Sequence, residues 1–119
     1  MSTEFTLGPF EQAVLAAILT LQGNAYGVTI QTKVAELVEP KTVSLGAIYV
    51  TLERLEEKGF LRSWRSDPIP ERGGRAKRCY ALAAAGERAL RDSAPAIQRM
   101  HEVLSQEFGG RRWKPAPAR

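Results

Sequence analysis

Few side chains in this chain could carry out chemistry. It contains one histidine, His101, and one cysteine, Cys79. A hydrolytic site needs a nucleophile beside a base, and a zinc site needs several Cys, His or acidic ligands at short spacing. Neither pattern occurs, and Gly73-Gly74 lacks the lysine and following helix of a phosphate-binding loop. The sequence therefore predicts no enzyme, no catalytic residue, no metal and no cofactor.

The basic residues suggest a binding function instead. The formal net charge is +4, but residues 1–40 hold one lysine and four glutamates, a net of −3, so residues 41–119 carry +7. Residues 62–78 alone carry +4, and Arg72, Arg75 and Lys77 flank the Gly-Gly pair. Clustered cations neutralise phosphates, which favours double-stranded DNA as partner. Charges that keep an exposed hairpin soluble give the same pattern.

The stretch 44–59 has helical spacing and two different faces. Ser44 is a preferred N-cap and Gly59 a preferred C-terminal residue. At about 100° per residue, one stripe is apolar: Leu45, Ile48, Tyr49, Leu52 and Leu55. An arc of about 80° on the other side is small, then hydroxylated, then basic: Ser44, Ala47, Thr51, Arg54 and Lys58. Such a face suits a major groove, although solvated helices also look like this.

Other segments supply a framework around this helix. Pro9 favours a first helix over 9–22, and a second begins near Tyr26-Gly27 and stops before Pro40, with a minimal strand at Val43. Residues 60–66 and 77–82 read as strands around a hairpin tip at 67–76. A helix-turn-helix followed by a hairpin is a winged helix. The expected fold is mainly α with a small β-hairpin (α+β).

The last helix, 84–108, has a longer apolar seam than so small a core needs. Pro95 predicts a kink in it. The surplus seam favours pairing with a second copy, although folding back on the first helix is the alternative. The residues expected in a dimer interface are Phe10, Val14, Leu90, Ile97, Met100, Val103, Leu104 and Phe108.

The remaining segments complete the domain organisation. We expect a flexible arm over 1–8, a DNA-binding domain over 9–83, the dimerisation helix over 84–108 and a disordered basic tail over 109–119. No apolar run approaches the length of a membrane span. Acidic residues near the start and a single cysteine favour the cytoplasm.

Four segments carry a resemblance to a known family. They are AYGVTI (25–30), SLGAIYVTLERLEEKGFL (44–61), PERGGRAKRCYAL (70–82) and AAGERAL (84–90). Together they resemble the PadR family of bacterial winged-helix repressors, in its short single-domain branch, over about residues 7–105. Cys79 stands where the family usually has an aromatic residue.

The resemblance implies a homodimer that binds an inverted-repeat operator and represses transcription. Helix 44–59 would enter the major groove and the wing would touch the backbone. Tyr49 lies at the edge of the apolar stripe, so either DNA or the core is compatible with its position, and the same holds for Tyr26. The residues expected near DNA are Tyr26, Lys41, Ser44, Gly46, Ala47, Tyr49, Thr51, Arg54, Lys58, Arg72, Arg75 and Lys77.

Two further points concern a possible effector and an alternative function. Some relatives bind aromatic or drug-like effectors between the dimerising helices, but here only Met100 and Phe108 are available to pack against such a ligand. The alternative function is a winged-helix module that binds protein, or nucleic acid without sequence readout. In that case the basic residues would matter and Ser44 and Thr51 would not.

Overall fold

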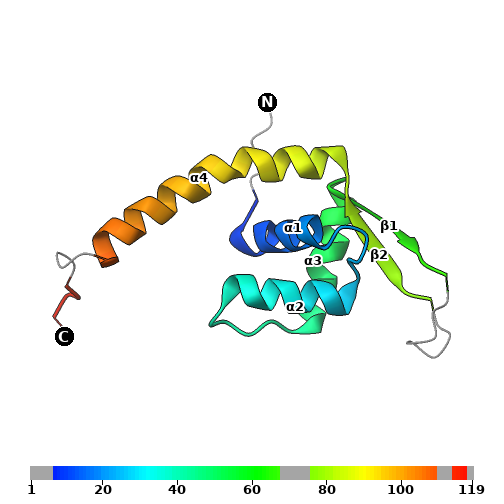
Figure 1. Cartoon of the computed structure of the whole chain (residues 1–119), viewed down its shortest axis with the longest axis horizontal. Coiled ribbons are helices and arrows are strands. Elements are labelled where there is room, and N and C mark those ends of the chain that lie inside the picture. The colour runs from blue at the N-terminus through cyan, green and yellow to red at the C-terminus, as the bar shows by residue number, and fades with distance from the viewer. Residues whose placement is uncertain (1–6, 68–75, 110–113, 118–119) are drawn as a thin grey trace.

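The computed structural model describes residues 7–67, 76–109 and 114–117. Its elements are α1 (Pro9–Leu21), α2 (Gly27–Val38), α3 (Leu45–Glu57), β1 (Leu61–Arg65), β2 (Arg78–Leu82) and α4 (Ala84–Gly109). Helices α1, α2 and α3 pack together, the β1–β2 hairpin projects from one end, and α4 runs over α1 and extends past the other end (Figure 1). The expected class, a winged helix-turn-helix with a long terminal helix, is confirmed.

Local signals set the helix ends close to where the sequence predicts them. Pro9 begins α1, where a missing N–H costs no hydrogen bond. The Ser44 hydroxyl caps α3 by accepting a hydrogen bond from the Ala47 N–H at 3.0 Å. Gly59, with φ +82°, turns the chain out of α3 in a conformation that residues with a Cβ rarely adopt.

The core lies between the three packed helices and the base of the hairpin. Leu7 is 5% exposed and belongs to this core, so the expected arm 1–8 is too long by its last residues; residues 1–6 lie outside the described part of the chain. Val14 is also fully buried, which removes it from any interface with a second copy. The side chains with no exposed surface are Val14, Leu15, Ala17, Ala25, Ile30, Val34, Ile48, Leu52 and Leu55.

The hairpin is joined to the helices at a place that the sequence did not indicate. The expected strand at Val43 is absent, because residues 42–44 form no ladder. Instead Tyr26 forms an isolated antiparallel bridge with Cys79, and the Tyr80 N–H donates to the Ala25 carbonyl at 2.9 Å. The residues before α2 therefore extend the hairpin and fix the wing relative to the helix-turn-helix.

Helix α4 has one apolar face with two different environments. At about 100° per residue, Gly86, Leu90, Ile97, Leu104 and Phe108 share this face. Gly86 is buried and Leu90 packs against the core, whereas Ile97 is 39% and Leu104 51% exposed. Pro95 lies inside the helix without ending it, and the helix changes direction along its length (Figure 1). The C-terminal half of the seam projects beyond the chain's own core.

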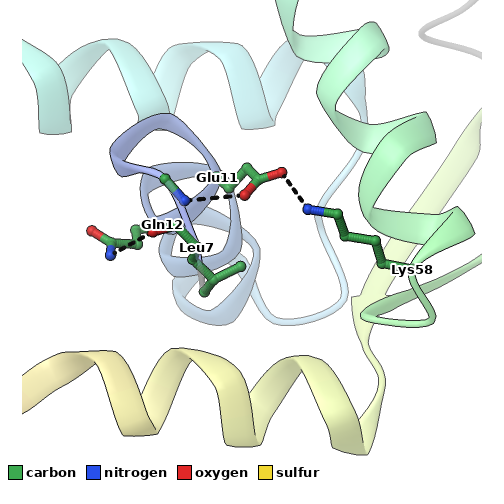
Figure 2. A network of polar contacts seen from close by, with 5 residues as sticks. Leu7, Glu11, Gln12 and Lys58 are labelled. Atoms are coloured by element: carbon green, nitrogen blue, oxygen red, sulfur yellow. Dashed lines mark hydrogen bonds and ion pairs between the residues drawn. The ribbon is translucent and has the colours of Figure 1, made fainter. Parts of the chain in front are cut away.

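A polar network ties α1 to the end of α3. Lys58 Nζ lies 3.0 Å from Glu11 Oε2, and the Gly8 N–H donates to Glu11 Oε1 at 3.1 Å (Figure 2). Burial raises the pKa of the Glu11 carboxyl, but the hydrogen bonds from Lys58 and Gly8 and the positive charge of Lys58 outweigh it. The pKa of Glu11 is therefore below its ordinary value of 4.5.

Replacing Glu11 with glutamine is expected to destabilise the protein by about 1 kcal/mol at pH 7, because a partly buried ion pair is lost. A lowered native pKa stabilises the fold above pH 4.5, and this stabilisation disappears as the pH falls through the native value. Urea unfolding between pH 3 and pH 7 measures the difference. Glu36→Gln, at an exposed i,i+3 pair with Lys33, is the control with a smaller effect. A difference between Glu11→Gln and the parent that does not change with pH would contradict this role.

Candidate nucleic-acid interface

The outward face of α3 is rotated relative to the predicted arc. Thr51 is only 4% exposed, whereas Tyr49 is 47% and Val50 55% exposed. Lys58 points back to α1 and pairs with Glu11 (Figure 2). Thr51 and Lys58 were expected near DNA, and the structure turns both inward. The exposed residues of the helix and its cap are Ser44, Gly46, Ala47, Tyr49, Val50, Glu53, Arg54, Glu56 and Glu57.

This rotation follows from the neighbours of α3. The helix contacts α1, α2 and β1, so its buried side is shifted from the predicted apolar stripe. The buried side includes Thr51 and leaves Tyr49 exposed. Thr51, which is small and β-branched, fits the side packed against these elements. Tyr49, at the other edge of the stripe, is 47% exposed and therefore lies outside the buried core.

Tyr49 also contacts the start of α2. A Cβ added to Gly27 would lie 2.7 Å from Tyr49 Cζ and closer still to the hydroxyl. No side chain fits there without moving the ring, since real Cβ contacts are longer. The Tyr26-Gly27 and Ile48-Tyr49 motifs, which are far apart in sequence, therefore meet at the corner between α2 and α3. Gly27 is needed for the position of Tyr49.

Charge is unevenly distributed along the outward face of α3. Its first half, with Gly46, Ala47 and Val50, carries no charge, and its second half exposes Glu53 and Glu57 beside Arg54. The expectation of a face that becomes basic toward its end is wrong, because Lys58 turns away and the glutamates are exposed. Carboxylates repel phosphates, so only the first half suits close approach to DNA.

The hairpin carries the other half of the interface. Arg62, Arg65 and Arg78 are exposed on β1 and β2. Lys77 Nζ lies 3.9 Å from the centre of the Tyr26 ring, and Arg62 Cζ lies 5.6 Å from the centre of the Trp64 ring. Arg72 and Arg75 lie outside the described residues. Of these cations, Lys77 lies against Tyr26, the residue that precedes α2.

A chain of hydrogen bonds fixes the wing against α3. Arg78 Nη1 donates to Ser63 Oγ at 2.8 Å, and Ser63 Oγ donates to Glu56 Oε2 at 2.7 Å. Arg65 lies opposite Arg78 in the strand register, a like-charged pair that is destabilising without a counterion. A phosphate approaching the hairpin would relieve that repulsion.

Tyr26 and the exposed residues of the first turn of α3 are placed to contribute to the candidate surface. Tyr26 is half-buried and precedes α2, and Lys41 is exposed in the turn before α3. The residues expected near DNA did not include Val50, Arg62, Trp64, Arg65 and Arg78, which the structure exposes. The signal for Val50 was present, because an exposed valine lies opposite the centre of the buried side of the helix.

The side chains predicted for dimerisation fall into two groups. Val14, Phe10 and Leu90 are used by the chain's own core, fully or in part. The exposed group lies along the second half of α4: Ile97, Met100, Val103, Leu104 and Phe108. Only this second group is available to a partner.

Among the described residues, no three His, Cys, Asp or Glu side chains are grouped as metal ligands. No helix within the described ranges is both long and apolar enough to span a membrane.

Comparison with known proteins identifies the class. The sequence model of the transcriptional regulator PadR-like family matches residues 14–92. No curated protein matches the chain. The fold is similar to that of a PadR family transcription regulator from hypervirulent Clostridium difficile, with 24% identity and a TM-score of 0.69, covering 87% of this chain and 100% of that one.

Two further structures share the fold. A transcriptional regulator from Clostridium thermocellum is 17% identical, with a TM-score of 0.64, and the match covers 89% of this chain and 96% of that one. BpsR from Bordetella bronchiseptica, whose DNA binding is regulated by 6-hydroxynicotinic acid, is 15% identical with a TM-score of 0.67. That match covers 87% of this chain and 69% of BpsR.

The fold and the basic hairpin therefore define a winged-helix, DNA-binding transcription regulator. The chain belongs to the PadR-like family, since the family model covers more than half of its length.

Proposed function

We propose that the protein binds an inverted-repeat operator as a homodimer and represses the adjacent gene. The observation that carries this proposal is the exposed, uncharged first half of α3, in a helix whose other end is hydrogen-bonded to a hairpin bearing Arg62, Arg65 and Arg78. A recognition helix contacts bases with its N-terminal residues, and hairpin cations bind the backbone or the minor groove. Glu53 and Glu57 would then lie where α3 leaves the groove.

A second copy of the chain completes the proposed operator-binding protein. The uncovered half of the α4 seam requires a partner surface, and the same seam on another chain is complementary to it. Two-fold symmetry pairs naturally with two inverted half-sites about 34–36 Å apart. As a regulator of chromosomal genes, the protein would act in the cytoplasm.

An effector site would lie where the α4 seams of the two copies meet. Met100 and Phe108 are the seam side chains able to pack against a flat ring, and both are more than half exposed in the single chain. BpsR is regulated by a hydroxylated nicotinic acid, so small aromatic acids are reasonable first compounds for a binding screen.

The test begins with selection of preferred sites from a pool of random duplexes. Fluorescence anisotropy then compares the selected duplex with a scrambled one at several salt concentrations. We expect a wide affinity gap, with log K falling by about 0.9 per log unit of salt for each phosphate contacted. Equal, strongly salt-dependent binding to both duplexes would indicate a non-specific module, and no binding by a folded dimer would favour a protein partner.

Replacing Gly27 with alanine is expected to weaken binding to the selected duplex by about 1–2 kcal/mol, within the range for a contact near a base. The added methyl would push the Tyr49 ring away from α2. Anisotropy measures the loss. In a Tyr49→Ala background the same Gly27 substitution should have little further effect, because no ring remains to be displaced. Equal losses in both backgrounds would show that Gly27 acts independently of Tyr49.

A further inference from the structure

The first half of the outward face of α3 offers almost no hydrogen-bonding side chains. Gly46 and Ala47 are exposed and carry none, and the Ser44 oxygen accepts the Ala47 N–H, which leaves its O–H as a single donor. Tyr49 reaches toward Gly27, so its hydroxyl lies at the α2 side of the face. This part of the helix therefore has few groups with which to distinguish bases by hydrogen bonding.

Val50 is the prominent apolar group on that face. Its side chain is 55% exposed, and the residues one turn earlier, Gly46 and Ala47, are too small to cover it. One turn later come Glu53 and Arg54, whose charged groups extend outward. An exposed valine that follows two small residues and lies beside Tyr49 on this face is placed to make an apolar contact with a ligand in the groove.

The major groove presents one apolar group that can match it. Guanine, adenine and cytosine show nitrogen and oxygen atoms at their groove edges, and thymine adds a C5-methyl group. Side chains such as alanine and the threonine methyl group contact that methyl in protein–DNA complexes. Valine has the same chemistry with a larger apolar surface.

We propose that Val50 contacts the C5-methyl of one thymine in each operator half-site and so determines specificity at that position. This inference rests on the proposed function, because it requires α3 to lie in the major groove. It goes further by naming the base and the chemical group that are read. Uracil pairs as thymine does but lacks the methyl, so it isolates this contact.

The experiment replaces each thymine of the selected operator with deoxyuridine, one symmetric pair at a time. For the parent protein, we expect one pair to weaken binding by about fourfold per half-site, the effect of removing one methylene-sized apolar group. Val50→Ala, whose single methyl group ends short of the valine methyl groups, should show a smaller thymine preference than the parent protein. Val28→Ala, which alters a valine of similar exposure (50%) on α2, should keep the thymine preference.

The outcomes separate this inference from the proposed function. A parent protein that binds the selected operator tightly but tolerates uracil at every position overturns the role of Val50 and leaves the function intact. A thymine preference in Val50→Ala that is as large as in the parent protein also overturns it. Failure to select any preferred duplex overturns both, and this is seen before uracil is introduced. Thermal unfolding of Val50→Ala verifies that the exposed substitution leaves the fold unchanged.

Discussion

Replacing Leu104 with glutamate is expected to convert a dimer into a monomer and to lower operator affinity by about 100-fold or more. The side chain is 51% exposed and lies in the middle of the uncovered half of the α4 seam. In the proposed dimer it is buried against the partner, where a carboxylate without a counterion is strongly unfavourable. A monomer holds one half-site only, so it loses the gain in affinity from binding two linked sites.

Sedimentation gives the direct measurement of this substitution. The variant should sediment as a 13.1 kDa species, and the parent as a species of twice that mass. Gln106→Glu is the matched control, because Gln106 is exposed on the opposite side of the same helix and gains the same charge. We expect it to remain dimeric. A Leu104→Glu protein that still sediments as a dimer would place the interface elsewhere.

Replacing Gly86 with alanine is expected to destabilise the protein by about 1–3 kcal/mol, the range for overpacking a buried site. An added Cβ would lie 2.9 Å from the Phe60 carbonyl carbon and closer to its oxygen. The Phe60 backbone is held by its N–H bond to the Leu55 carbonyl and by the bond from the Ala83 N–H, both 2.9 Å. Because neither backbone segment yields easily, α4 would have to lift from the core.

Gly46→Ala is the matched control for this substitution. Gly46 is exposed in a helix, and a Cβ there would meet no atom within 4 Å. Alanine is favoured over glycine in a helix by about 0.5–1 kcal/mol, so the control should stabilise the fold. Urea unfolding at equal protein concentrations measures both effects, since the stability of a dimer depends on concentration. Similar values for the two variants would show that Gly86 is not packed as described.

The elements of this fold could be predicted from sequence because local chemistry sets them. Pro9, Ser44 and Gly59 each act on the backbone next to them, through a missing donor, a capping oxygen and a positive φ. The period of the apolar residues separates helix from strand in the same way. The winged-helix class and the order of the elements followed from such signals, and the family from the resemblance of four segments.

The candidate interface was only partly predictable. A helical wheel gives the angles between side chains, but it does not say how far the neighbouring elements wrap around the helix. Thr51 was therefore expected outside and is buried, and Val50 was overlooked and is exposed. Which face of α3 is exposed depends on α1, α2 and β1 together, and no single segment encodes it.

Contacts between residues that are distant in the sequence account for the features that the sequence did not predict. Lys58 pairs with Glu11, 47 residues earlier, and this pairing turns it away from the outward face of α3. Gly86 appeared in the sequence only as part of a family motif, and the Phe60 backbone beside it supplies the reason for a glycine. By itself, the sequence determined the elements, their order and the basic character of the hairpin. The tertiary structure decided which face of α3 points outward, where α4 packs on the core and how the wing is attached. Each of these depends on which surfaces meet when the chain is packed.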